Sequence, residues 1–190
     1  MTVREIRQIG DPVLRVRAGD VDPATVGSPE VQALIDDLID TMRSANGAGL
    51  AAPQVGATVR VAVMEVASNP RYPYKPMIPL TVAINPVIEP LDDEIVEIYE
   101  GCLSVPLRGV VPRHVNIRVS YLDRHGVQHD EIHRGLTAGT WQHECDHLDG
   151  VLFVDRVTDT GTLATWEEYE ANHRDAFVER ITEFVERVGS

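Results

Sequence analysis

The segment 143–147 constrains this chain more than any other, because it reads His-Glu-Cys-Asp-His. Two histidines four residues apart on a helix lie about one turn apart, so both imidazoles project from one face and can bind the same metal ion. Glu144 lies about 100° around the helix axis from His143, close enough to reach a water beside the metal without ligating the metal. The pattern predicts a metal site with His143 and His147 as ligands and Glu144 as general base.

A catalytic zinc-type site holds three protein ligands and one open position, so a third ligand must come from elsewhere in the chain. A metzincin would place a histidine six residues after His147, but Phe153 stands there. A thermolysin-like site would use a glutamate roughly twenty residues further along. The glutamates with that spacing are Glu167, Glu168 and Glu170.

Cys102 is the other source of a third ligand. It stands in the segment 100–104, Glu-Gly-Cys-Leu-Ser, at the end of an expected strand, where Gly101 lets the backbone approach closely. A thiolate with two imidazoles makes a good donor set for a divalent metal. Cys145 is the rival thiol, but it follows His143 by two positions and so points roughly 200° away from it. We expect Cys145 to pack as a small apolar residue.

Length and composition indicate an ordinary globular protein. The 190 residues fit one catalytic domain over residues 1–190, and 43% hydrophobic with 25% charged residues argue against disorder and coiled coil. The net charge of -13 disfavours DNA or RNA as a partner. The sequence has no apolar run of roughly 18 residues, so no membrane span is expected. The start of the chain has no apolar signal segment, and its two cysteines are expected to be reduced thiols in the cytoplasm.

The hydrophobic pattern predicts an α+β fold, with antiparallel strands around the central histidine-motif helix and one further helix toward each terminus. Ser28 and Pro29 begin the first helix, expected over residues 28–42. The central helix is expected over residues 137–148 and the last over residues 165–188. Strands are expected over residues 59–66, 80–88, 95–99, 114–122, 127–133 and 151–154, and a proline-rich surface loop over residues 69–76.

The glycine-rich segment 47–56 superficially matches a dinucleotide-binding fingerprint. That fingerprint follows a strand and opens a helix, whereas this segment follows a helix and meets Pro53. Small residues beside one amide side chain, Gln54, suit the close passage of an extended peptide and a hydrogen bond to a developing oxyanion. In the alternative interpretation, the segment 47–56 is only a tight connection into the strand expected over residues 59–66.

Three segments in this order resemble the motifs of the peptide deformylase family. They read Gly-Ala-Gly-Leu-Ala-Ala-Pro-Gln at 47–54, Glu-Gly-Cys-Leu-Ser at 100–104 and Gln-His-Glu-Cys-Asp-His-Leu-Asp-Gly at 142–150. The resemblance runs from residue 11 to residue 156 and fades over the last helix. It implies hydrolytic removal of the N-formyl group from formylmethionine at the start of nascent polypeptides.

The resemblance also implies one divalent metal ion per chain. In the family this ion is often Fe(II), and Zn(II) or Ni(II) can replace it in purified protein. The implied ligands are Cys102, His143 and His147.

Further roles follow from the same resemblance. Glu144 would move protons, while the Gln54 amide and the backbone N–H of Leu103 would donate to the oxyanion. The formyl-methionyl peptide would lie extended beside Gly49 and Gly101. For Arg108, contact with the peptide backbone and a plain surface-charge role are both open.

The sequence departs from the family pattern in two places. Ala48 and Gly139 stand where relatives often place larger apolar residues near the pocket for the methionine side chain, so the shape of that pocket is not predicted. From residue 155 onward nine acidic residues stand against four arginines, whereas some relatives dock on the ribosome through a basic tail. Ribosome docking is therefore not expected.

Two other interpretations compete with a deformylase. One is a gluzincin-like metallo-endopeptidase with a ligand from the last helix, and the other is a non-catalytic protein with a structural metal. Structural zinc sites are normally closed by four protein ligands, whereas this set supplies three beside a free glutamate. That difference favours an enzyme.

Overall fold

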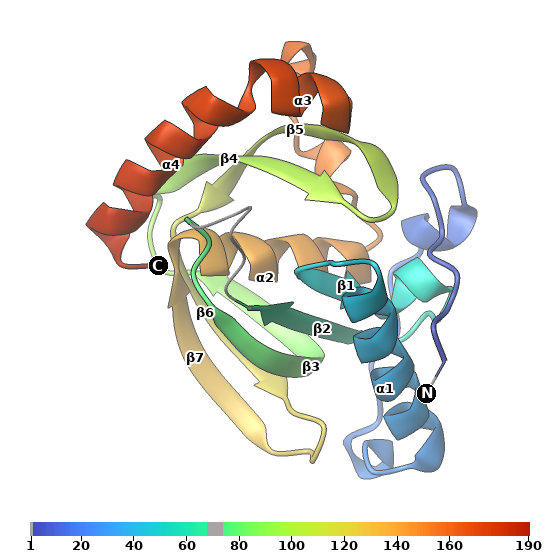
Figure 1. The fold of residues 1–190 in the computed structure, drawn as a ribbon. Coiled ribbons are helices and arrows are strands. Elements are labelled where there is room, and N and C mark those ends of the chain that lie inside the picture. Colours follow the sequence, from blue (N-terminus) through green and yellow to red (C-terminus); the bar gives the residue numbers. More distant parts are fainter. Residues whose placement is uncertain (1, 68–73) are drawn as a thin grey trace.

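The computed structural model describes residues 2–67 and 74–190, so most of the proline-rich loop predicted over residues 69–76 lies outside the described residues. The strands form two antiparallel sheets, one with the order β1-β2-β3-β6-β7 and one that pairs β4 with β5 (Figure 1). The strands of the larger sheet are β1 Gly49–Ala51, β2 Val61–Val66, β3 Ile78–Pro90, β6 Asn116–Leu122 and β7 Gln128–Arg134. Those of the smaller sheet are β4 Ile95–Cys102 and β5 Val105–His114.

The described residues contain four α-helices, and the second of them is central. They are α1 Pro29–Ser44, α2 Gly135–Leu148, α3 Trp166–Asn172 and α4 Arg174–Val188. Helix α2 lies between the two sheets, α1 packs beside β1 and β2, and the α3–α4 pair covers the smaller sheet (Figure 1). This arrangement confirms the predicted α+β fold around the histidine-motif helix.

Helix α1 forms where the sequence predicts it. The hydroxyl of Ser28 accepts a hydrogen bond from the Val31 N–H at 3.3 Å, and Pro29 occupies the first helical position. Its apolar face is fully buried at Ile35, Leu38 and Met42. That face packs against β1 and β2, and so supports the glycine-rich segment from behind.

Helix α2 separates an apolar side from a polar one. Trp141 and Ala138 pack against Met64 and Ile117 of the larger sheet. The opposite side faces β4 and carries the buried polar residues Glu144 and His147 and the half-buried His143. Burial of charged groups on a helix requires partners or a ligand, so this side is where a functional site is expected.

Four elements differ from the sequence prediction, and the first is β1, a three-residue strand inside the glycine-rich segment for which no strand was expected. Strand β5 was not predicted, because Pro106, Gly109 and Pro112 interrupt the alternation that marks a strand. The strand expected over residues 151–154 is wrong, since the chain turns there into a short 3-10 helix, Phe153–Asp155. The last helix is broken at His173 into α3 and α4, which turns α4 back along the smaller sheet.

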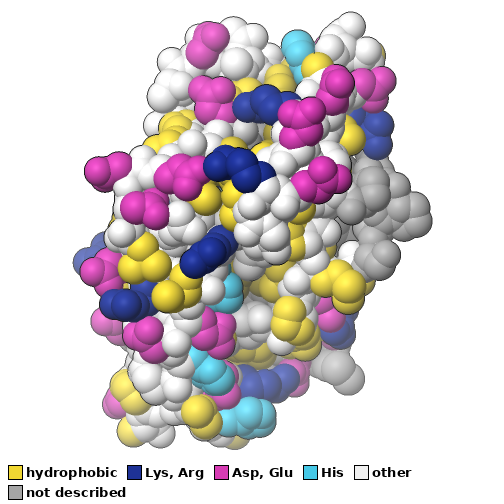
Figure 2. All heavy atoms as spheres, turned by 90° about the vertical axis from the view of Figure 1, so that its left-hand side faces the viewer, with side chains coloured by type: hydrophobic (Ala, Val, Ile, Leu, Met, Phe, Trp, Pro, Cys, Tyr) yellow, Lys and Arg dark blue, Asp and Glu magenta, His cyan; other side chains and the backbone are white. Residues whose placement is uncertain are grey.

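The face of the molecule that carries α4 mixes acidic, basic and apolar side chains (Figure 2). Arg187 and Arg180 of α4 approach Glu94 and Glu97 at 3.2 and 3.8 Å. Exposed pairs of this kind contribute little to stability, so the apolar side of α4 is what attaches it. None of the helices within residues 2–67 and 74–190 is long and apolar enough to cross a membrane.

Candidate active site

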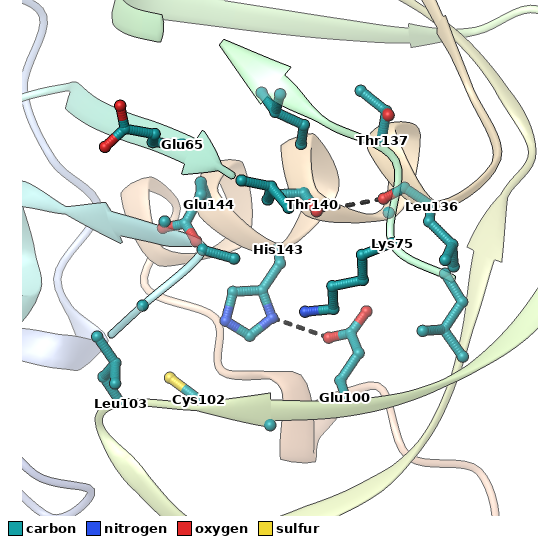
Figure 3. A pocket seen from close by; sticks show the side chains of 18 of the residues that line it. Glu65, Lys75, Glu100, Cys102, Leu103, Leu136, Thr137, Thr140, His143 and Glu144 are labelled. Atoms are coloured by element: carbon teal, nitrogen blue, oxygen red, sulfur yellow. Dashed lines mark hydrogen bonds and ion pairs between the residues drawn. The ribbon is translucent and has the colours of Figure 1, made fainter. Parts of the chain in front are cut away.

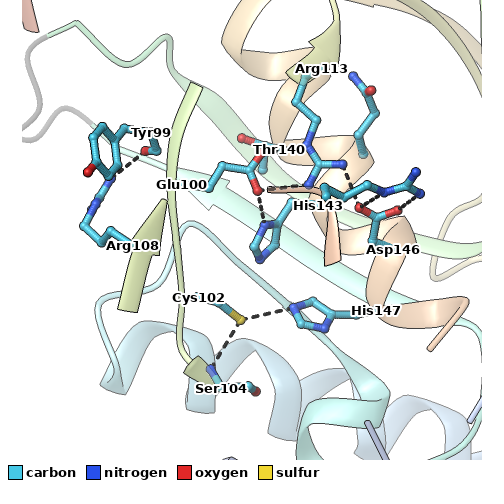
Figure 4. A network of polar contacts seen from close by, with 12 residues as sticks. Tyr99, Glu100, Cys102, Ser104, Arg108, Arg113, Thr140, His143, Asp146 and His147 are labelled. Atoms are coloured by element: carbon cyan, nitrogen blue, oxygen red, sulfur yellow. Dashed lines mark hydrogen bonds and ion pairs between the residues drawn. The ribbon is translucent and has the colours of Figure 1, made fainter. Parts of the chain in front are cut away.

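Three side chains that could ligate a metal ion meet where the end of β4 faces α2 (Figure 4). Cys102 is the last residue of β4, and His143 and His147 lie one turn apart on α2. Their ligand atoms all lie within 4.8 Å of one another, and Cys102 Sγ is 3.3 Å from His147 Nε2. Within the described part of the chain, no other group of three Cys, His, Asp or Glu side chains is placed to hold a metal ion. One thiolate and two imidazoles at this spacing fit a single divalent metal.

Glu100 fixes the orientation of His143. Its Oε2 lies 2.8 Å from His143 Nδ1, which leaves the Nε2 atom of the imidazole for the metal. Arg113 donates to both oxygens of Glu100, at 2.6 and 2.9 Å. Burial alone would raise the pKa of Glu100, but the guanidinium of Arg113 outweighs burial and lowers that pKa to about 2. Glu100 therefore stays ionised as the partner of the His143 imidazole.

Arg113 also joins the smaller sheet to α2 (Figure 4). Its Nη1 donates to Asp146 Oδ2 at 2.6 Å, and the other Asp146 oxygen accepts from Arg156 at 2.7 Å. The side chains of Glu100, Arg113 and Asp146 are all buried, so loss of one would leave an unpaired buried charge. The network thus fixes the strand that carries Cys102 against the helix that carries the histidines.

Hydrogen-bond donors surround the thiol of Cys102. The Ser104 N–H lies 3.3 Å from Cys102 Sγ, and Gln54 Nε2 lies 3.6 Å from it. These contacts hold the sulfur atom in a fixed position. Burial lowers the pKa of His147 well below its ordinary value, which keeps that imidazole neutral as a metal ligand must be.

The amide of Gln54 has a fixed orientation. Its Oε1 accepts from the Ala51 N–H at 2.8 Å, and its Nε2 donates to Ser104 Oγ at 3.0 Å. The amide nitrogen of Gln54 therefore faces Cys102. Leu103, the other predicted oxyanion donor, follows Cys102 directly and lines the same cleft.

Glu144 is buried beside the cluster of Cys102, His143 and His147. Its side chain is 4% exposed, and Oε2 has no hydrogen-bond partner among the described residues. Burial raises the pKa of this carboxyl to about 7. A Cβ atom on Gly49 would stand 2.2 Å from Glu144 Oε1, so only glycine leaves room for the carboxylate there. The glycine-rich segment therefore shapes the position of the Glu144 side chain.

These groups open into a cleft of about 580 Å³ (Figure 3). Ile98 of β4, Leu136 of α2 and Phe177 of α4 supply apolar walls. A Cβ atom on Gly139 would lie 2.7 Å from Ile98 Cδ1, so Ile98 occupies the space that a larger residue at position 139 would take. The absence of a side chain at Gly139 therefore makes room for Ile98 of β4.

Lys75 was missed by the sequence analysis. It is the single lysine of the chain, and it reaches into the cleft between Glu100 and Leu136 (Figure 3). Burial against the cleft wall lowers its pKa to about 8, with a smaller opposing effect from Glu100. A lone lysine in an irregular segment carries no pattern, so no sequence signal identifies it.

Arg108 is not a surface charge, so that alternative is wrong. The side chain is 6% exposed and lines the cleft, and its Nη2 donates to the backbone oxygen of Tyr99 at 2.7 Å. Gly101 also lines the cleft, and a Cβ atom there would lie 3.4 Å from Arg108. Both predicted substrate contacts on this side therefore face the site.

The competing ligands predicted from sequence do not join the cluster. Glu167 and Glu168 are exposed on α3, and Glu170 is half-buried beside Arg174 at 3.4 Å. Cys145 is buried, and burial raises the pKa of its thiol to about 12, so it stays protonated. The prediction that it packs as a small apolar residue is confirmed. A gluzincin-like site is not favoured.

The fold and this site define a metal-dependent amidohydrolase of the α+β class. The sequence model of the family described as Polypeptide deformylase matches residues 3–162, and the chain belongs to that family. Peptide deformylase 2 of Ralstonia nicotianae is 46% identical over 178 residues, which are 91% of this chain and 99% of the relative. Peptide deformylase 2 of a Nostoc species is 47% identical over 166 residues, covering 87% and 92% of the two chains.

Solved structures agree with the sequence comparisons. The Met-Ala-Ser-bound class I type b peptide deformylase from Acinetobacter baumannii superposes with a TM-score of 0.79 at 38% identity. The match covers 82% of this chain and 99% of that chain. The protein is thus a hydrolase that removes the N-formyl group from formylmethionine at the start of newly made polypeptides.

Proposed function

We propose that Cys102, His143 and His147 hold one Fe(II) ion and that Glu144 is the general base of deformylation. The observation that carries this proposal is the position of Glu144, buried without a hydrogen-bond partner among the described residues and next to the three ligands. A buried carboxyl group beside a metal site is suited to proton transfer.

The bound metal supplies Lewis acidity, which polarises the formyl carbonyl and lowers the pKa of a water. Glu144 takes a proton from the attacking water while the water oxygen bonds to the formyl carbon. When the bond between that carbon and the peptide nitrogen breaks, Glu144 returns the proton to the leaving amine. The products are formate and a peptide with a free N-terminus. A carboxyl pKa near neutrality serves both proton transfers, and burial of Glu144 supports that value.

Two donors stabilise the negative charge that grows on the formyl oxygen. The first is the side-chain amide of Gln54, which Ala51 and Ser104 hold in place before substrate arrives. The second is the backbone N–H of Leu103, next to the ligand Cys102. Donors fixed in advance need no reorganisation during the reaction, which is why they accelerate it.

The substrate lies extended along β1, the edge strand of the larger sheet. An edge strand offers main-chain hydrogen bonds that read little sequence, which suits an enzyme that processes many nascent chains. Gly49 and Gly101 admit the peptide from opposite walls, and Arg108 donates to its backbone. The bound Met-Ala-Ser peptide of the Acinetobacter baumannii enzyme supports an extended product in this position.

The assignment of Fe(II) is tested by metal exchange. Apo-protein is reconstituted anaerobically with iron, nickel or zinc and then exposed to air, while activity and the mass of the Cys102 peptide are followed. Oxygen can oxidise Fe(II) or the thiolate, so the iron form should lose activity fastest. Equal loss for the iron and nickel forms, with Cys102 unmodified, would contradict this part of the proposal.

The 190 residues act as one catalytic domain, because the α3–α4 pair packs on the smaller sheet and lines the same cleft. Its proposed location is the cytoplasm, where it would meet newly made chains. Its partners are formyl-methionyl nascent peptides. The acidic residues of the last two helices do not support ribosome docking through that region.

The activity itself is tested with three matched peptides. Formyl-Met-Ala-Ser, acetyl-Met-Ala-Ser and unmodified Met-Ala-Ser are incubated with iron-loaded protein prepared without oxygen, and released formate, acetate and shortened peptides are measured. We expect formate alone. Cleavage of an internal peptide bond would favour an endopeptidase instead.

A further inference from the structure

Trp166 is a residue of the cleft that the family match does not include. The matched region ends at residue 162, whereas Trp166 begins α3 after the N-cap residue Thr165. Its side chain lines the cleft and is 37% exposed. An exposed indole at the mouth of a substrate cleft presents a large apolar surface at small conformational cost.

The indole of Trp166 is held in place by Arg108. The guanidinium carbon of Arg108 lies 4.5 Å from the centroid of the Trp166 ring and 4.1 Å from that of Tyr169. The backbones of Arg108 and Ala164 also exchange hydrogen bonds of 2.8 and 3.0 Å, which fix the start of α3 on β5. The ring is therefore oriented before any substrate binds.

This position is close to the chemistry. A Cβ atom on Gly101 would lie 3.1 Å from Trp166 Cζ2, and Gly101 directly precedes the ligand Cys102. Residues of an extended peptide follow one another at about 3.3 Å, so a peptide whose first residue lies at Cys102 carries its next residues along the cleft. Leu136, Gly139 and Thr140 of α2 line the same cleft, whereas Trp166 belongs to α3.

A second observation also points to a ligand here. The side chain of Arg108 is 6% exposed, and its Nε has no hydrogen-bond partner among the described residues. A buried N–H normally has an acceptor, and a peptide carbonyl can supply one. The backbone of a bound peptide at Arg108 would carry its side chains past Trp166.

We propose that Trp166 is a specificity-determining residue that contacts a side chain downstream of the formylmethionine and selects aromatic or large apolar residues there. Arg108 already occupies one face of the indole, so its positive charge opposes a second cation and favours an apolar partner. The proposal rests on the deformylase activity and adds a preference to it.

The test compares kcat and KM for three substrates with Trp166→Ala, Trp166→Phe and the wild type. The substrates are formyl-Met-Ala-Ser, formyl-Met-Phe-Ser and formyl-Met-Ala-Phe. The wild type should prefer one of the two phenylalanine peptides, and Trp166→Ala should reduce that preference about 3- to 10-fold, through KM rather than kcat. Trp166→Phe should keep most of it. The matched control is Ile181→Val, a buried change in α4 outside the cleft, which should leave the preference unchanged.

A spectroscopic readout complements the kinetics. The chain has two tryptophans, of which Trp141 is buried. Binding of the product Met-Phe-Ser or Met-Ala-Phe should shift the emission of the wild type, and Trp166→Phe should abolish that shift. If Trp166→Ala does not fold, the fluorescence still decides, because product binding without an emission shift in the wild type would overturn the proposal.

A wild-type enzyme without preference for either phenylalanine peptide would overturn the proposal, as would an unchanged preference in Trp166→Ala. Failure of the wild type to release formate from any of the three peptides would instead overturn the deformylase activity. The two failures are therefore distinguishable.

Discussion

The two ends of the cleft are stabilised by different interactions. At the metal end, Glu100, Arg113 and Asp146 are buried charges that satisfy one another through hydrogen bonds of 2.6 to 2.9 Å. At the far end, Phe177 of α4 packs on the rings of Tyr99 and Tyr169, with centroid distances of 6.0 and 6.5 Å. The metal end depends on directional contacts, whereas the far end depends on apolar burial.

The two ends of the cleft also differ in how far the family model covers them. Every residue of the metal end lies inside residues 3–162, whereas α3 and α4 lie beyond them. Hydrogen-bonded charges tolerate few replacements, but apolar contacts can be made by many side chains. We therefore expect substitutions at the metal end to change the chemistry and substitutions at the far end to change stability and selectivity.

Glu144→Gln should have the largest effect. The amide keeps the shape of the carboxylate but cannot accept the proton, so kcat should fall by about 10² to 10⁴-fold. Metal content, measured by elemental analysis, should remain near one ion per chain because Glu144 is not a ligand. Loss of the metal would contradict the assignment.

Phe177→Ala tests the other side of the comparison. Loss of a buried aromatic side chain should lower the free energy of unfolding by about 3 to 5 kcal/mol, measured by urea denaturation. The exposed neighbour Glu179 provides the control, since Glu179→Ala should change stability by no more than about 0.5 kcal/mol. Folded Phe177→Ala protein should still bind one metal ion, and metal loss would show that the two ends are not independent.

Gln54→Leu removes one donor to the oxyanion while keeping the bulk of the side chain. On the precedent of other oxyanion donors, kcat should fall about 10² to 10³-fold. Steady-state kinetics on formyl-Met-Ala-Ser would measure this effect. A change confined to KM would assign Gln54 to ground-state binding.

Glu100→Gln should reveal a pH-dependent share of stability. The pKa of Glu100 is about 2 in the folded protein against an ordinary value of 4.5, so its ionised form stabilises the fold. That contribution, at most about 3 kcal/mol, is complete above pH 4.5 and is lost as the pH falls toward 2. Urea denaturation with a chelator present should therefore show a difference between wild type and variant that shrinks below pH 4.5. A constant difference would contradict the pKa.

The metal end could be predicted from sequence because its chemistry depends on local spacing. The four-residue separation of His143 and His147 places two ligands on one helix face, and Glu144 follows from the same helical geometry. Cys102 was one of several candidates until the three-motif resemblance favoured it. The position of Gly49 against Glu144 could not be predicted, because it depends on how β1 packs against α2.

The far end could not be predicted for a related reason. Phe177 and Trp166 have the spacing of an ordinary amphipathic helix, and the break at His173 that turns α4 has no glycine or proline to mark it. The prolines of β5 interrupt the pattern that predicts a strand. A two-stranded sheet tolerates these prolines, because the outer edge of each strand needs no hydrogen-bond partner. Long-range packing determines all three features.

The hydrogen bonds of Arg113 determine how the site responds to a change of ion. Because this guanidinium connects Glu100 to Asp146, the separation between β4 and α2 is set by protein contacts rather than by metal bonds. An ion that leaves does not release the two elements, and an ion that enters meets donors already in position. We therefore expect exchange between ions of similar size to require no refolding.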